Sequence, residues 1–322
     1  MAFDDAYQAL TDHDDDARWA YGTGFTDPLA GVPGGFPEGV DRADLAAYHL
    51  MLGDDALIMS HRLQQWVTHA PELEDELALA NIGLDLLGQA RLLLTRAGEA
   101  EGEGRDEDAL AYHRGPAEFR NVRLAERGDA DFAHLVGRLL FFTTWRLSLF
   151  DRLASAPDPM LAAIAAKGVK ELTYHRDYAA RWVVRLGDGT DLSHRRMTAA
   201  VGALLPLTEE LFQPSEVELR LSASGIAVDP SSLRAEFDAV LAEVFAAATL
   251  KPAPMAATNA EPAGHDTESP GHDTDPTGRG TDPTGRGTDP TGRGRDGEHT
   301  EALSEILAEL QQLARAVPWG VW

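Results

Sequence analysis

The sequence contains no cysteine, which excludes disulfides, thiolate metal sites and cysteine nucleophiles. A metal ion in this chain would therefore need histidine and carboxylate ligands. Lysine is also scarce, since only three of the 28 basic residues are lysines. Against 53 acidic residues this gives a formal net charge of −25 at pH 7, which argues against general affinity for nucleic acid or anionic membranes. This composition predicts a halophilic source. Codon bias towards arginine, alanine, glycine and aspartate is an alternative explanation, and the two are compatible.

Two sequence signals for membranes and export are missing as well. The N-terminus lacks a basic stretch followed by an apolar one, and no apolar run approaches membrane-spanning length. We therefore expect a cytoplasmic protein. Residues 1–42 are acidic and rich in glycine and proline without sustained periodicity, which predicts a flexible N-terminal arm.

Apolar residues at helical spacing dominate the rest of the chain. They predict four long helices, over about 41–70, 71–98, 132–153 and 161–187, and shorter ones at 194–212 and 231–249. We therefore expect an all-α fold, a ferritin-like four-helix bundle over residues 43–251 with additional C-terminal helices. In the second helix one set of residues alternates strictly by four and three and is predicted to form the inner seam: Leu73, Leu77, Ala80, Leu84, Leu87, Arg91 and Leu94.

A tandem repeat interrupts the helical pattern. The heptapeptide TDPTGRG occurs at 274–280, 281–287 and 288–294, and each copy carries proline and glycine but no apolar side chain. Such a segment can bury no surface, so residues 252–297 are predicted to be a disordered linker. After it, 298–322 is predicted to form a last helix that docks back on the body.

Ferritin-like di-iron proteins place Glu on two helices and Glu-x-x-His on the other two. None of the 11 histidines has Glu three residues before it. Where the motif would stand, Asp85-Leu-Leu-Gly88 offers glycine, and Glu171-Leu-Thr-Tyr174 offers tyrosine with His175 one residue late. Two imidazole ligands are therefore missing, and we expect no catalytic, cofactor-binding or metal-binding residue in this chain.

Carboxylates in such a core would need partners, because an unpaired buried charge is costly. The pattern predicts a vestigial di-iron site that is buried and charge-paired, with Gly88 and Tyr174 in place of the histidine ligands. Five residues are predicted to form its polar network: Asp55, Asp85, Arg146, Glu171 and His175. In the alternative arrangement, Asp55 and Asp85 point to solvent while Glu171 and His175 form a local i,i+4 pair.

Three long motifs carry a resemblance to a known family: LGDDALI at 52–58, the run 68–91 from Thr68 to Arg91, and KELTYH at 170–175. They resemble the C subunit of the multicomponent phenylacetyl-CoA epoxidase, and similar stretches extend over 47–322. The acidic arm and the repeat depart from the family pattern.

The resemblance implies a non-catalytic subunit that pairs with a related catalytic A subunit, stabilises it, and belongs to the same complex as the other epoxidase subunits. The A subunit would hold the di-iron site, and a reductase subunit with flavin and an iron–sulfur centre would deliver electrons from NADPH. The complex would epoxidise the aromatic ring of phenylacetyl-CoA during aerobic phenylacetate degradation.

Two other functions stay open from the residues alone. The chain could be a bundle oxygenase in its own right, with Asp55, Asp85, Glu171 and His175 as metal ligands. It could also be an assembly or salt-adaptation scaffold that acts through its arm and repeat.

Overall fold

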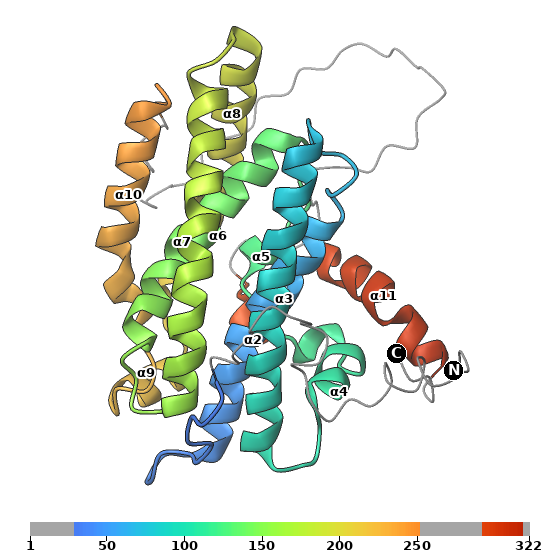
Figure 1. The fold of residues 1–322 in the computed structure, drawn as a ribbon, viewed down its shortest axis with the longest axis vertical. Coiled ribbons are helices and arrows are strands. Elements are labelled where there is room, and N and C mark those ends of the chain that lie inside the picture. Colours follow the sequence, from blue (N-terminus) through green and yellow to red (C-terminus); the bar gives the residue numbers. More distant parts are fainter. Residues whose placement is uncertain (1–28, 252–291, 318–322) are drawn as a thin grey trace, which may run out of the picture.

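The computed structural model describes residues 29–251 and 292–317, and within these ranges every regular element is a helix (Figure 1). The prediction of an all-α fold is confirmed. The arm up to residue 28 and the repeat region 252–291 lie outside the described residues, as do 318–322.

Four long helices form two antiparallel pairs. Helix α2 (Arg42–Gln64) packs along α3 (Leu73–Glu101), and α6 (Phe132–Leu153) packs along α7 (Pro159–Gly187). Aspartate side chains cap three of these helices by accepting hydrogen bonds from free backbone N–H groups at the first turn: Asp41 for α2, Asp131 for α6 and Asp158 for α7. The sequence therefore specifies where these helices begin.

Shorter helices cover the bundle on two sides. Helices α8 (Asp191–Leu204) and α10 (Arg234–Ala247) pack on α6 and α7 (Figure 1). Helix α11 (Glu301–Ala316) lies across α2, α4 (Glu107–Tyr112) and α5 (Arg123–Glu126). The stretch 194–212, expected as one helix, changes at Leu205–Pro206 into a 3-10 helix. The remaining elements are α9 (Glu216–Ser222) and the 3-10 helices η1 (Pro116–Glu118), η2 (Leu205–Phe212), η3 (Pro230–Leu233) and η4 (Gly294–Asp296).

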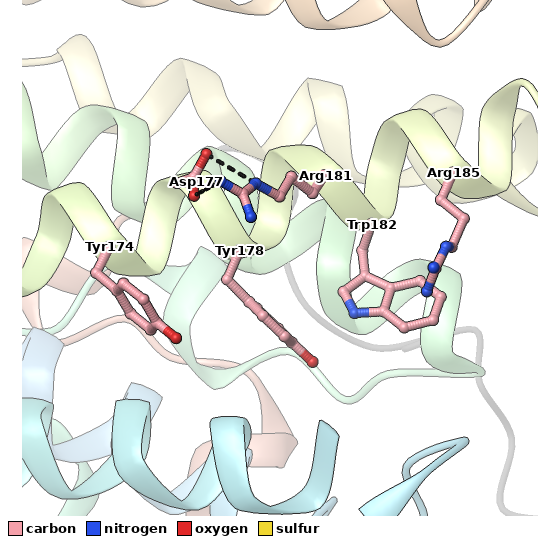
Figure 2. Close-up of a pocket in the computed structure, with 6 residues that line it drawn as sticks. All are labelled: Tyr174, Asp177, Tyr178, Arg181, Trp182 and Arg185. Atoms are coloured by element: carbon pink, nitrogen blue, oxygen red, sulfur yellow. Dashed lines mark hydrogen bonds and ion pairs between the residues drawn. The ribbon is translucent and has the colours of Figure 1, made fainter. Parts of the chain in front are cut away.

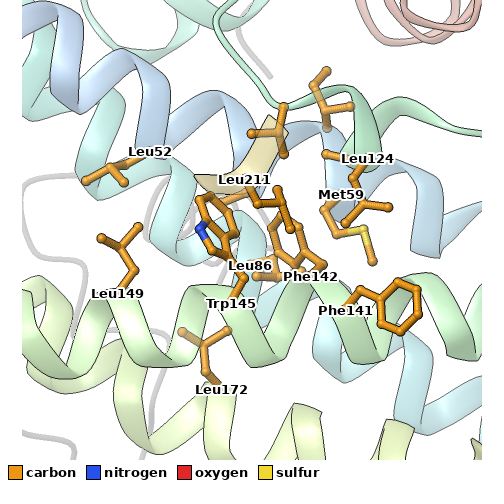
Figure 3. Close-up of a cluster of buried hydrophobic side chains, with 14 of the residues drawn as sticks. Leu52, Met59, Leu86, Leu124, Phe141, Phe142, Trp145, Leu149, Leu172 and Leu211 are labelled. Carbon is orange, nitrogen blue, oxygen red and sulfur yellow. The ribbon is translucent and has the colours of Figure 1, made fainter. Parts of the chain in front are cut away.

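Helix α6 lies at the centre of the hydrophobic core (Figure 3). Its Phe142 and Trp145 are almost completely buried and pack edge to face with ring centroids 6.1 Å apart. Leucines from the other three long helices surround them, including Leu52, Leu86 and Leu172. Every residue of α6 from Leu135 to Phe150 is buried, so the neighbouring elements cover this helix on all sides.

The predicted inner seam of α3 is wrong except at its C-terminal end, where Leu94 is buried. Leu73, Leu77, Leu84 and Leu87 are 66, 57, 58 and 37% exposed. A different face of α3 is buried, formed by Leu79, Ile82, Leu86 and Leu93. Helix α3 carries apolar residues on two faces, and the packing of its neighbours decides which face is covered.

The second apolar face of α3 also bears on the expectation that no segment is long and apolar enough to span a membrane. Among the described residues, α3 is long and apolar enough to cross a bilayer by length and composition, contrary to the sequence prediction. The same helix buries Gln89 and Arg96 among the other helices and has three acidic residues in its first turn, which is typical of a core helix.

The described end of the predicted flexible arm is bound to the bundle. Phe36 lies under the guanidinium groups of Arg42 and Arg96, 3.8 and 3.5 Å from its ring centroid. Arg96 also donates hydrogen bonds to the carbonyls of Gly34 and Gly35, at 2.7 and 3.1 Å. The carbonyls of Gly34 and Gly35 are open to a buried arginine because glycine has no side chain. The end of the arm is therefore bound to the bundle although it contains few apolar residues.

Candidate functional site

Asp55 of α2 lies at the centre of a buried ionic cluster. Its carboxylate is fully buried and accepts two hydrogen bonds from Arg295, at 3.0 and 2.8 Å, and one from the Val122 backbone N–H at 2.8 Å. A second guanidinium, that of Arg146, lies 3.9 Å away. Two cations and a backbone dipole thus neutralise this carboxylate, and the alternative in which it faces solvent is wrong.

Arg146 of α6 connects this cluster to the other side of the bundle. It donates to the Leu52 carbonyl and to the Gln89 side chain, both at 3.1 Å, and it stacks over Phe150 at 4.3 Å. Burial lowers the pKa of Arg146 to about 10, so the side chain stays protonated at neutral pH.

Gln89 of α3 extends the chain of contacts to α7. Its amide donates to Glu171 at 2.9 Å, and Glu171 also accepts from Lys167 at 2.7 Å. Asp55, Arg146 and Glu171 therefore belong to one network, joined through an amide that the sequence pattern did not indicate. Glu171 pairs with Lys167, one turn earlier in α7, rather than with His175.

His175 and Asp85 form a separate pair. The fully buried His175 approaches Asp85 at 2.9 Å through Nε2, whereas the Asp85 side chain is 44% exposed. This pair joins α7 to α3 at the edge of the bundle. The predicted five-residue network is thus divided into two groups of contacts.

Gly88 and Tyr174 were predicted to replace metal ligands in a buried core, and that placement is wrong. Tyr174 is 64% exposed. A Cβ added at Gly88 would meet no other atom within 4 Å, so this position faces open space. Both residues lie on the outer side of α3 and α7, because the helix rotation that buries Leu86 and Leu172 turns them outwards.

Arg295 is the most important residue that the sequence pattern did not predict. It lies within the predicted disordered linker, yet it is 5% exposed. Besides Asp55 it binds the backbone carbonyls of Met51 and Arg120, at 3.2 and 2.5 Å. Burial alone would lower the pKa of Arg295, but the nearby carboxylates of Asp55 and Glu218 raise it above its ordinary value.

The linker prediction is therefore wrong for residues 292–297. Gly294 ends the third repeat, and its N–H donates to Glu210 at 2.7 Å, while an added Cβ there would lie 1.9 Å from the Asn121 carbonyl oxygen. A signal was present in the sequence: the fourth copy of the repeat does not follow, and Arg295 stands where threonine would begin it.

The neighbouring Asp54 is bound in the same way by a different segment. Its fully buried carboxylate accepts from Arg114 at 2.5 and 3.0 Å and from the Arg120 backbone N–H at 2.8 Å. Consecutive aspartates on α2 thus hold the connector between α3 and α6 and the segment before α11. Asp54 and Asp55 are therefore buried because the arginines and backbone groups that they bind lie inside the protein.

These side chains do not fit a di-iron centre. Arg146 and Arg295 place two positive charges beside Asp55, which satisfy the carboxylate and would repel a metal cation. Within the described ranges no group of three or more His, Cys, Asp and Glu side chains converges in a metal-binding arrangement. The positions of Asp55, Asp85, Glu171 and His175 therefore do not support a common metal site.

A surface pocket of about 260 Å³ lies along α7, beside α3 (Figure 2). Tyr178 and Trp182 both donate to Asp75 of α3, at 3.0 and 2.9 Å. Burial and this hydrogen bond raise the pKa of Tyr178. The two arginines at the rim are engaged, since Arg181 pairs with Asp177 at 2.9 Å and Arg185 lies over Trp182. The polar groups of this pocket join α7 to α3.

The fold and the cluster together define a ferritin-like helical bundle in which arginines surround the central carboxylate. Residues 37–274 match the family described as phenylacetic acid catabolic protein, and the chain belongs to that family. Over 278 residues it is 44% identical to the C subunit of 1,2-phenylacetyl-CoA epoxidase from Escherichia coli (strain K12). The alignment covers 86% of this chain and 99% of that relative, so the resemblance drawn from the motifs is confirmed.

Proposed function

We propose that this chain is the non-catalytic structural subunit of a phenylacetyl-CoA epoxidase in aerobic phenylacetate degradation. It pairs with a related di-iron catalytic subunit and stabilises it within a cytoplasmic hetero-oligomer. NADPH, flavin and an iron–sulfur centre belong to the reductase subunit of the complex. The similarity to the C subunit of an epoxidase, along nearly the whole of that relative, supports this proposal.

The ionic cluster around Asp55 is the single observation that carries the non-catalytic role. Where a bundle enzyme would hold metal ligands, this chain has a carboxylate neutralised by Arg146 and Arg295. The three side chains are at most 5% exposed. A site that is already charge-paired and closed offers neither an open coordination position nor space for a substrate.

Co-expression with a catalytic subunit encoded in the same genome tests the proposal. Iron content and epoxide formation would be measured for this chain alone, for the catalytic subunit alone and for the mixture, each with phenylacetyl-CoA, NADPH and the reductase subunit. We expect iron to follow the catalytic subunit, and activity to persist only when this chain accompanies it.

Two results would contradict the proposal. Stoichiometric iron and epoxide formation by this chain alone would make it an oxygenase in its own right. A catalytic subunit that is fully active and stable alone, and that does not co-elute with this chain, would remove the structural role.

A further inference from the structure

Four exposed leucines form one line along α3, which we call the leucine stripe: Leu73, Leu77, Leu84 and Leu87. Their exposed fractions of 37–66% show that no described residue covers them. The stripe extends over about 21 Å of helix, at 1.5 Å per residue. Isolated surface leucines are common, but a contiguous apolar line of this length marks an interaction site.

The spacing of the stripe indicates what shape covers it. Together with the partly buried Ala80, its members alternate by four and three, a repeat of 3.5 residues. That period keeps the apolar seam facing a second helix that crosses at a shallow angle of about 20°. A partner helix is therefore expected to lie lengthwise on α3.

Helices of this chain pack on both sides of the stripe and leave it open between them. On one side Ser60 of α2 donates to the Gly83 carbonyl at 2.6 Å. On the other side His175 of α7 binds Asp85. Tyr174, adjacent to His175 on α7, is itself 64% exposed.

Charge next to the stripe argues against a second copy as the partner. Glu72, Glu74 and Glu76 stand at its N-terminal end, and Asp85 stands beside Leu84. Parallel pairing of two stripes would place these glutamates against each other, and antiparallel pairing about Ala80 would bring them to Asp85. With −25 on each chain, self-association would bring two strongly acidic surfaces together.

We propose that the leucine stripe is the docking surface for a helix of the catalytic epoxidase subunit. This inference rests on the proposed function and assigns the surface that carries it. The partner helix has an apolar seam with a 3.5-residue period, and lysine or arginine flanks the seam where it meets Glu72, Glu74 and Glu76.

The double substitution Leu77→Gln, Leu84→Gln tests this surface in the full chain. Both positions are exposed and glutamine is a good helix former, so the fold should be kept. The matched control is Leu192→Gln, Leu313→Gln, which changes two leucines that are 52 and 57% exposed on α8 and α11. Binding to the catalytic subunit would be measured by biolayer interferometry, and the mass of each protein alone by light scattering.

We expect the stripe variant to bind at least about 100-fold more weakly, since buried anchors dominate interface energies, and the control to change by less than about threefold. Unchanged binding by the stripe variant, while the wild type binds, would overturn the docking surface and leave the proposed function intact. No binding by the wild type would instead count against the proposed function.

Other occupants of the stripe give different results. A wild-type dimer that the stripe variant converts to a monomer would identify a second copy and overturn the inference. Increased binding of an apolar dye after deletion of residues 1–28, absent in the stripe variant, would show that this chain covers its own stripe and would also overturn it.

Discussion

Asp55 and Arg295 are 240 residues apart in the sequence and form a buried ion pair at 2.8 Å. The pair joins the middle of α2 to the segment that leads into α11. The same arginine also binds the Met51 and Arg120 carbonyls, so one side chain ties three parts of the chain together. Such a contact makes the stability of the bundle depend on a segment that follows a repeat.

Replacing Arg295 with methionine should destabilise the protein strongly. The change leaves Asp55 buried with one fewer cation, and breaking one side of a buried ion pair typically costs about 3–5 kcal/mol. Urea unfolding followed by circular dichroism would measure the loss. The double variant Asp55→Asn, Arg295→Met should not restore the wild-type stability, because it leaves the buried Arg146 guanidinium without its carboxylate partner. Arg181→Met, at a pair whose arginine side chain is 79% exposed, should change stability by less than about 0.5 kcal/mol.

Two deletions of equal length should separate the repeat from the docked segment. Removing 274–287 takes out two copies of TDPTGRG and should leave the unfolding free energy nearly unchanged, since loop length affects closure entropy only weakly. Removing 284–297 also deletes Arg295 and should destabilise at least as much as Arg295→Met. Thermal unfolding of both variants would check this, and equal stability would show that 292–297 contributes nothing.

The glycines at 88 and 168 should respond in opposite ways to alanine. A Cβ at Gly88 meets nothing within 4 Å, so Gly88→Ala should stabilise α3 by about 0.5–1 kcal/mol through helix propensity. A Cβ at Gly168 would lie 2.6 Å from the Phe150 ring, so Gly168→Ala should destabilise by about 1–3 kcal/mol. Denaturant titration would measure the free energy of unfolding of both variants. A loss of stability in Gly88→Ala would contradict the outward position of Gly88 on α3.

His49 should make the protein sensitive to mild acid. Its ring is fully buried, with Nδ1 donating to the Leu45 carbonyl at 2.7 Å, and burial lowers its pKa below 6.5. Below pH 6.5 the unfolded chain therefore takes up a proton that the folded chain refuses, and stability falls by up to about 1.4 kcal/mol per pH unit until the folded pKa is reached.

The substitution His49→Leu tests this dependence. Melting temperatures measured from pH 7 to pH 5.5 should fall less steeply in this variant than in the wild type. The matched control His69→Leu changes an exposed histidine and should keep the wild-type slope. Parallel slopes for all three proteins would contradict the role of His49.

Salt should stabilise the protein because of its net charge of −25. Raising KCl screens repulsion between exposed carboxylates, whereas the buried pair of Asp55 and Arg295 is shielded from the ions. We expect the melting temperature to rise steadily between low and molar KCl. A flat or falling curve would argue against adaptation to concentrated salt.

The sequence indicated which residues belong to the site better than it indicated how they are arranged in space. The sequence predicts Asp55, Arg146 and Glu171 as members of one polar network, and in the structure they do lie in one network. Gln89 is not indicated by the sequence, because an amide on a helix face carries no distinctive local pattern, and Arg295 is marked only by the point where the repeat ends. The expectation that Gly88 and Tyr174 lie inside rests on a motif position, and a motif position does not determine which face of a helix is covered.

The sequence by itself determined the helical class, the beginnings of the long helices and the family. Local signals suffice for these, since caps, periodicity and long motifs act within a few turns of chain. Only the tertiary structure decided which apolar face of α3 is covered and which arginine reaches Asp55. Both depend on contacts between distant segments: two leucine-rich faces on one helix are equivalent until α2 and α7 pack against one of them.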